Sequence, residues 1–209
     1  MKYIDVTLTY KPGMRGVEFE PAKNIKEDGW NATTLHLYSH AGTHMDAPTH
    51  FEVNNGSVDQ YPVDRFFNTC HLIDLIGIQP NTEIRIEDLR NVKQILKKGE
   101  GLIFRTGWSK FQNNLIYRDG LPPISKKLAL WCAEKGVSVV GVEPPSVADV
   151  NNLPLLTEIH TILLKADILI VEGLTNLEQI SKPKVKLIAL PLKVEGGDGA
   201  PCRVIVIED

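Results

Sequence analysis

The pattern of hydrophobic and polar positions differs between the two halves of the chain. Short alternating or continuous apolar runs, bounded by Gly and Pro, recur throughout and predict β-strands. From residue 86 onward, stretches with apolar residues three or four positions apart lie between these runs and predict helices. The expected strands are 2–8, 32–39, 70–76, 101–106, 137–142, 168–171, 186–190 and 203–207, and the expected helices are 86–96, 125–135 and 160–166. The pattern therefore predicts an α/β fold, a mixed β-sheet with helices.

Two of these elements carry additional signals. The run 101–106 is nearly continuously apolar, which is typical of a central strand covered on both faces. For the helix 125–135, Ser125 is a suitable N-terminal cap, and Gly136 is a suitable residue to end it. At 209 residues the chain is long enough for one well-buried domain, so we expect a single domain over residues 1–209.

Composition and charge narrow the class of protein. Hydrophobic residues make up 43% and charged residues 23%, as in ordinary globular proteins, and the net charge of −3 argues against nucleic acid or an anionic membrane surface as a partner. No stretch reaches the ~20 apolar residues of a membrane-spanning helix, and residues 1–6 lack the apolar region of a secretion signal. Three isolated cysteines, Cys70, Cys132 and Cys202, are expected to be buried and reduced, which favours a cytoplasmic location. The expected partner is a small-molecule substrate.

Residues 39–51 contain the candidate chemistry. Three of the six histidines and one aspartate fall within eleven residues, as His40, His44, Asp46 and His50. Imidazole and carboxylate are donors that suit Zn, Mn or Fe. Gly42 and Pro48 disfavour a continuous helix, so we expect a loop leaving a strand that turns its donors inward. The alternative, a polar surface loop with incidental histidines, fits this spacing poorly.

The donor types favour a catalytic site over a structural one. Structural zinc sites are closed by four ligands, often Cys, whereas catalytic sites keep an open position for water, and this segment contains no Cys. A bound metal lowers the pKa of its water to roughly 7 from 15.7. We therefore expect metal ligands among the donors of this segment, with His50 left as the general acid–base.

The segment resembles the signature of the cyclase family of metal-dependent hydrolases, H-x-G-T-H-x-D-x-P-x-H. That family includes bacterial kynurenine formamidases and isatin hydrolases. The resemblance continues over nearly the whole chain, at 105–108, 141–146, His160 and 171–177. It implies the swivelling β/β/α-type fold of that family.

The resemblance also implies a ligand set. By position, His40, His44 and Asp46 would hold one ion. Asp46 and Glu172 would bridge to a second ion that His160 completes, and His50 would carry the proton. Glu172 ends an apolar run, where an unpaired buried carboxylate would be costly and a metal would relieve that cost. We expect Zn²⁺, with Mn²⁺ as the second choice, and one or two ions per chain.

The chain departs from the formamidase pattern in ways that concern the substrate. The W-P-G-D motif of formamidases aligns with residues 11–14, Lys-Pro-Gly-Met, and Glu143 stands where an Asp is usual. Lys11 or Arg15 is a candidate to contact a carboxylate on another substrate. His36 and His71 match nothing in the signature and are expected to be structural.

The expected function is hydrolysis of an amide or cyclic amide by metal-activated water, arylformamidase-like, with kynurenine formamidase activity in tryptophan catabolism as its best-known form. Alternatives are isatin-type ring opening, lactone hydrolysis, a lyase or cyclase reaction, and metal binding without chemistry. The Gly-rich run 196–199 joins two strands, so it is interpreted as a turn and not as a dinucleotide fingerprint. By analogy with the family, we expect a homodimer or homotetramer.

Overall fold

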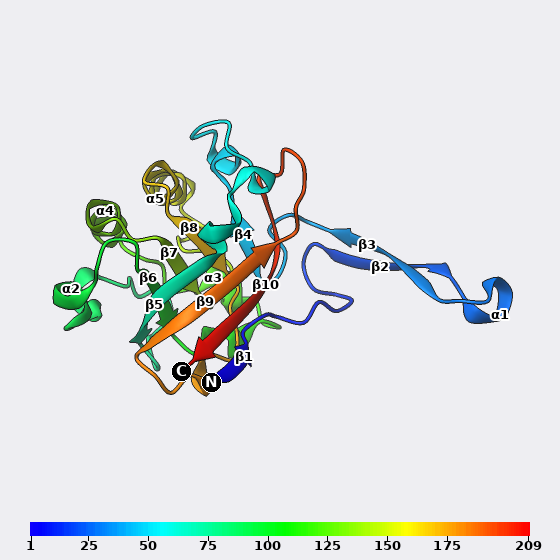
Figure 1. The fold of residues 1–209 in the computed structure, drawn as a ribbon, viewed down its shortest axis with the longest axis horizontal. Helices are drawn as coiled ribbons and strands as arrows, with labels where there is room; N and C mark the ends of the chain where they lie inside the picture. Colours follow the sequence, from blue (N-terminus) through cyan, green and yellow to red (C-terminus); the bar gives the residue numbers. More distant parts are fainter.

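The computed structural model, which describes all 209 residues, contains a mixed sheet that closes on itself (Figure 1). Its strands are β1 (Lys2–Asp5), β4 (His44–Asp46), β5 (Phe67–Asp74), β6 (Gly101–Arg105), β7 (Val139–Val142), β8 (Leu169–Glu172), β9 (Lys184–Pro191) and β10 (Gly199–Glu208). Their order is β1-β10-β4-β8-β7-β6-β5-β9, and β9 pairs again with β10. Seven strands therefore form a closed barrel, and β1 extends it beside β10. This confirms the predicted α/β fold with a mixed sheet.

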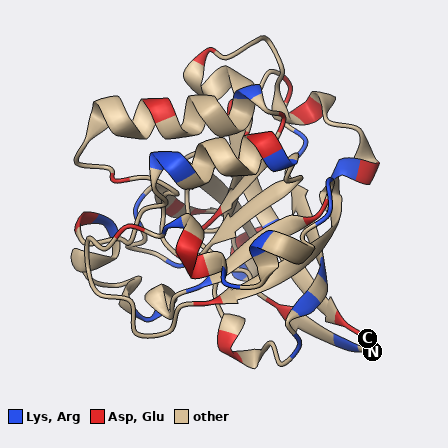
Figure 2. Cartoon of the chain, turned by 90° about the vertical axis from the view of Figure 1, so that its left-hand side faces the viewer, with Lys and Arg blue, Asp and Glu red and all other residues tan.

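The parallel part of the barrel is covered by helices. Strands β5 to β8 pair in parallel, and the other pairs are antiparallel. Helices α4 (Lys126–Lys135) and α5 (Leu153–Lys165) lie side by side over the parallel strands, with charged residues of both signs interspersed over this face (Figure 2). Crossover connections place helices on the face of a parallel sheet, which explains why strand 101–105 is apolar on both faces.

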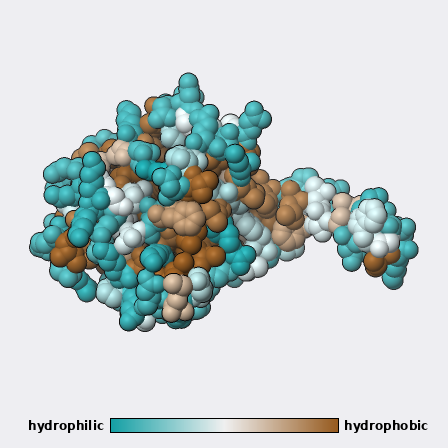
Figure 3. Space-filling view, in the orientation of Figure 1, coloured by the Kyte–Doolittle hydropathy of each residue, from teal (hydrophilic) through white to brown (hydrophobic).

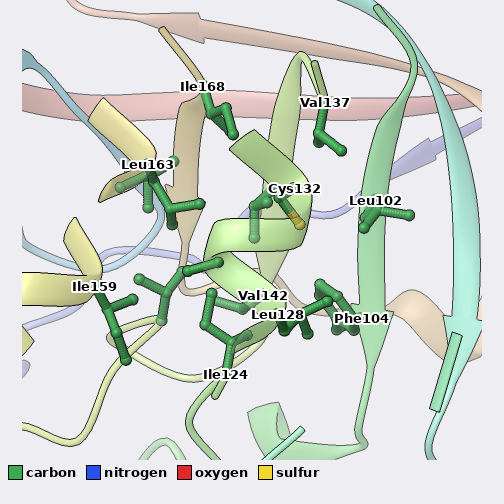
Figure 4. Close-up of a cluster of buried hydrophobic side chains, with 14 of the residues drawn as sticks. Leu102, Phe104, Ile124, Leu128, Cys132, Val137, Val142, Ile159, Leu163 and Ile168 are labelled. Carbon is green, nitrogen blue, oxygen red and sulfur yellow. The ribbon is translucent and has the colours of Figure 1, made fainter. Parts of the chain in front are cut away.

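Two apolar cores result from this arrangement. One lies between the sheet and the helices, where Leu128 and Cys132 of α4 pack with Phe104 of β6 and Leu163 of α5 (Figure 4). The other fills the barrel and contains, for example, Met45 of β4. Residues from β4 and β8 contribute to the barrel core, so the short strand β4 is held on both sides by packed neighbours.

Helix boundaries show which local signals were reliable. α4 begins after Ser125, whose side chain accepts from the amide of Leu128, and it ends at Gly136 with φ +65°, as predicted. α5 is longer than the predicted 160–166, because Asn152 caps it and a proline lies in its first turn. The predicted helix 86–96 is wrong: Arg90 adopts φ +51° and divides it into a 3-10 turn, Ile86–Leu89, and the single-turn α2, Val92–Ile95.

The remaining short elements lie in the connections. They are α3 (Ile116–Asp119) and the 3-10 helices Pro48–Phe51, Val58–Gln60, Val63–Phe66, Trp108–Phe111 and Leu177–Gln179. No helix in the structure is long and apolar enough to cross a membrane.

A two-stranded arm projects from the barrel (Figure 1). It consists of β2 (Val17–Lys23), α1 (Ile25–Asp28) and β3 (Ala32–Leu37), with the two strands antiparallel. The sequence pattern predicted β3 but not β2, which contains Pro21 and two glutamates. His36 lies on this arm 3.1 Å from Glu20, away from the barrel. His36 does not line the cavity that His40 reaches, because the strand ends at Leu37 before the loop turns inward, so His36 stays outside the candidate site, as expected.

Candidate metal centre

Sheet register brings two of the distant candidate residues together. His44 and Asp46 are the first and last residues of β4, so their side chains leave the same face of that strand. In the antiparallel pair β4–β8, His44 lies directly opposite Glu172. His44 Nε2 is 3.1 Å from Glu172 Oε2. The pairing of the two strands, and not their distance in sequence, therefore creates the contact.

His160 enters this cluster from helix α5. Its Nε2 is 3.4 Å from Glu172 Oε1 and 3.7 Å from Asp46 Oδ2. His44, Asp46, His160 and Glu172 are all at most 3% exposed. Asp46 Oδ2 is buried and has no hydrogen-bond partner. An unpaired buried carboxylate oxygen is costly, and a cation among these four side chains would remove that cost.

Backbone carbonyls orient both buried histidines. His44 Nδ1 donates to the carbonyl of Gly42 at 3.0 Å, and His160 Nδ1 donates to that of Leu156 at 2.8 Å. Because a carbonyl only accepts, the proton of each neutral ring lies on Nδ1 and Nε2 is left with its lone pair toward the carboxylates. Ligand histidines in metal sites are commonly held this way.

His40 and His50 lie on the more open side of the centre. Their rings stack at 3.8 Å, and His40 Nδ1 is 2.9 Å from Asp46 Oδ1. His50 belongs to the 3-10 helix Pro48–Phe51, and the neighbouring Phe51 stacks on His160 at 4.6 Å. The proline and glycine of the segment thus have the predicted effect: residues 40–50 form a loop, a short strand and a 3-10 turn instead of one helix.

Asp198 is a further residue of the site that the sequence pattern did not single out. Its Oδ2 is 3.2 Å from His40 Nε2 and 3.7 Å from His50 Nδ1. It lies in the Gly-rich run before β10, which pairs with β4, so the run is a turn as predicted and also borders the centre. No local sequence signal marks Asp198, because its position beside the histidines results from the pairing of β10 with β4.

The electrostatics separate His50 from the other histidines. Burial is the largest influence on the pKa of His50 and lowers it. The positive charges on His40 and His160 lower it further, the negative charge on Asp46 raises it, and the net pKa is below the ordinary value. Burial also lowers the pKa of His44 and His160, but the hydrogen bond and charge of Glu172 outweigh it and raise both. Among the histidines of this cluster, only His50 has a pKa held below the ordinary value, which favours the neutral imidazole that can accept a proton.

The donor set fits a divalent ion. Two sets of three side chains could each hold an ion, because the ligand atoms within each set lie within 4.8 Å of one another. One set is His40, Asp46 and His50, and the other is His44, Asp46 and Glu172. Nitrogen and carboxylate donors suit Zn or Mn, and Asp46 belongs to both groups. The assignment of His40, His44 and Asp46 to one ion stays a prediction.

An open cavity of about 880 Å³ reaches these side chains. Its base includes His40, His44, His50, His160 and Glu172, and its walls come mainly from segments 8–15 and 112–119. This volume lies within the roughly 300–1,000 Å³ of small-molecule sites. His71 lies outside it and pairs with Glu100 at 2.7 Å.

Glu143, which replaces the usual Asp of the resembling motif, supports one wall of this cavity. Its side chain accepts from the amides of Thr106, Gly107 and Trp108 and from the hydroxyls of Thr106 and Ser109. Its backbone carbonyl accepts from the Tyr117 hydroxyl at 2.7 Å, and Tyr117 lines the cavity. Its contacts therefore lie in the turn after β6 and at Tyr117, and none of them is with the buried donors.

The chain is similar to known proteins in sequence and in fold. The family model described as "Putative cyclase" matches residues 4–149. The kynurenine formamidase of Salinibacter ruber is 32% identical over 184 residues, which cover 88% of this chain and 83% of that protein. The kynurenine formamidase of Erythrobacter litoralis is 29% identical, covering 98% of this chain and 93% of that protein. Isatin hydrolase A from Labrenzia aggregata, solved with benzyl benzoate, superposes with a TM-score of 0.88 at 23% identity, over 98% of this chain and 93% of that one. The last comparison shows a shared fold and confirms the expected fold type.

Proposed function

The chain belongs to the cyclase family, and on this premise we propose that it is a metal-dependent hydrolase that cleaves the C–N bond of an aryl formamide or related amide. One observation carries the proposal: three buried donors at the base of an open cavity, His44, His160 and Glu172, surround Asp46, whose Oδ2 has no hydrogen-bond partner. The curated formamidase relatives support the same reaction, since they match almost the whole chain.

In this proposal His40, His44, Asp46, His160 and Glu172 are the ligands of Zn²⁺, with Mn²⁺ as the second choice. When bound, a divalent ion supplies Lewis acidity, which lowers the pKa of water to roughly 7 and polarises a carbonyl. The carbonyls of Gly42 and Leu156 hold the His44 and His160 rings with Nε2 inward, so little reorganisation is needed for binding. Whether one or two ions bind is measured by metal analysis of protein purified without chelator.

His50 is the proposed proton carrier. Its Nδ1 lies 3.7 Å from Asp198 Oδ2, so this carboxylate is close enough to stabilise a positive charge on the ring once it has accepted a proton. The pKa of His50 is held below its usual range mainly by burial, which keeps the ring neutral before the reaction. His50 would take the proton of the attacking water and deliver it to the leaving nitrogen.

Parallel assays test the proposed function. N-formylkynurenine, isatin and simple lactones are offered to the metal-loaded protein, and hydrolysis of the formamide is the expected result. Faster opening of isatin would assign the alternative, lactam hydrolysis, to the same centre, because both reactions pass through a tetrahedral oxyanion. Absence of hydrolysis of all three substrates would contradict a hydrolase of this class.

We also propose that the chain forms a homodimer or homotetramer in the cytoplasm. The arm exposes Ile25, Trp30 and Leu35, each more than half accessible, and an isolated two-stranded ribbon is only marginally stable. A second apolar area lies over β9 and β10, where Leu190 and Leu192 are exposed (Figure 3). Exposed apolar surfaces of this kind are typical of interfaces. Light scattering on the eluting protein measures the oligomeric state.

The three cysteines are buried and unpaired, which supports the proposed cytoplasmic location. Cell fractionation checks this location.

A further inference from the structure

The loop at residues 8–16 is fixed beside the histidine segment at both of its ends. The amide of Leu8 donates to Thr43 Oγ1 at 2.7 Å. At the other end, the carbonyl of Gly16 accepts from the amide of Tyr38 at 2.8 Å. Thr43 is next to His44, and Tyr38 lines the same cavity as His40. The loop therefore has a defined position over the cavity, although much of it is exposed.

Tyr10 adds a third connection. Its hydroxyl lies 2.9 Å from the carbonyl of Ala41 and 3.1 Å from that of Thr43. Gly42 has φ +57°, and a Cβ there would lie 2.8 Å from the Tyr10 ring. Gly42 thus permits the Tyr10 ring to pack closely against the histidine segment, and Tyr10 directly precedes Lys11.

Two cations on this loop have no partner. Lys11 and Arg15 both line the cavity, and neither side chain makes a hydrogen bond or an ion pair. The third Lys or Arg of the lining, Arg118, lies 3.3 Å from Asp119. Outside the buried donors, the cavity therefore has a surplus of positive charge at one wall.

We propose that Lys11 and Arg15 form a subsite for a carboxylate that the substrate carries away from its scissile bond. The preferred substrate is then a net-anionic aryl amide. This inference takes the cleaved amide bond from the proposed function. The recognition of a carboxylate is argued separately, from the two unpaired cations in the cavity wall. A zwitterionic substrate fits less well, because its ammonium group meets no unpaired carboxylate: Asp119 is occupied by Arg118, and Glu172 belongs to the buried donors.

A pair of substrates that share one scissile bond tests the subsite. 4-Formamidobenzoate and formanilide differ only in a carboxylate remote from the formamide. We expect the unaltered enzyme to prefer 4-formamidobenzoate. The double variant Lys11→Ala/Arg15→Ala should raise KM for this substrate about tenfold, since two exposed ion pairs at ~0.7 kcal/mol each amount to that factor. KM for formanilide should change by less than about twofold, because formanilide makes neither ion pair.

Lys127→Ala is the matched control, since Lys127 is an exposed, unpaired lysine on α4 outside the cavity. It should leave both KM values unchanged. Equal effects of the double variant on both substrates, or no effect on 4-formamidobenzoate, would overturn the subsite.

A binding measurement separates this inference from the proposed function. Calorimetric titration compares 4-aminobenzoate with aniline, neither of which needs to be hydrolysed. Binding of 4-aminobenzoate that weakens about tenfold in the double variant supports the subsite even if neither formamide is cleaved. Equal binding of 4-aminobenzoate to the double variant and the unaltered protein overturns the subsite, because the carboxylate then binds elsewhere.

Discussion

The buried centre and the rim of the cavity are built in opposite ways. The donors of the centre lie on barrel strands and on α5, at most 3% exposed, and backbone carbonyls orient both of its buried histidines. The rim is made of connecting segments, and its cations Lys11 and Arg15 are exposed and unpaired. Loops on a rigid scaffold can change without cost to the core. The difference therefore suggests that this chain keeps the chemistry of its family in the barrel and sets its substrate at the rim.

Substitution of Asp46 is the strongest test of the centre. Asp46→Ala removes the carboxylate shared by both donor groups. We expect loss of bound metal and a fall in kcat of roughly 10⁴, because metal stabilisation of several kcal/mol converts to about that factor. Metal analysis and turnover are measured together. Asp64→Ala, at an exposed aspartate without a side-chain partner, should change neither, and an active, metal-loaded Asp46→Ala protein would contradict the assignment.

Substitution of His50 separates proton transfer from metal binding. His50→Ala should keep the metal content and lower kcat by roughly a hundred- to thousandfold, as expected for loss of a general acid–base. KM should change little. If turnover remained near normal with the metal in place, the proposed role of His50 would be wrong.

Asp198 tests whether the centre extends to the turn before β10. Asp198→Ala removes the carboxylate near His40 and His50, and we expect kcat to fall roughly 10- to 100-fold, as for other residues that orient a ligand or base. The pH profile of kcat should shift in the same variant. Asp198→Asn, which keeps the size and a hydrogen-bonding oxygen, should recover part of the loss. Equal loss in both variants with an unchanged profile would indicate a purely structural role.

Glu100 should have the smallest effect on activity, because it lies outside the cavity. Burial raises its pKa, but Lys184, the Lys97 amide and His71 outweigh this and lower the pKa to about 2. Because the pKa of Glu100 is lower in the folded than in the unfolded protein, its carboxylate stabilises the fold at pH values above the unfolded pKa of about 4.5. This stabilisation is lost as the pH falls from 4.5 toward 2. Glu100→Gln should therefore cost about 2 kcal/mol at pH 7 and less near pH 3, with kcat unchanged. Denaturant unfolding at both pH values measures this; a large loss of activity would contradict the separation of the two regions.

Local pattern was sufficient for elements whose signals lie within a few residues. Ser125 and Gly136 bound α4 as predicted, since a cap needs only neighbouring atoms. The helix 86–96 was wrong because Arg90 adopts a positive φ of +51°, which interrupts a helix and which apolar spacing cannot reveal. β2 was missed since its strand character depends on pairing with β3 in the arm and not on an apolar face.

The residues of the candidate site also fall into two sets, those that local spacing indicates and those that only tertiary contacts bring together. Spacing within 40–50 was enough to indicate His40, His44, Asp46 and His50, because these donors lie on one short segment whose glycine and proline disfavour a single continuous helix. Glu172 meets His44 through strand register, and Asp198 meets His40 through the pairing of β10 with β4. Those contacts, together with the position of Lys11 and Arg15 over the cavity, depend on hydrogen bonds between segments distant in the chain. Only the closed barrel decides them, since periodicity describes which face a residue occupies but not which segment lies opposite.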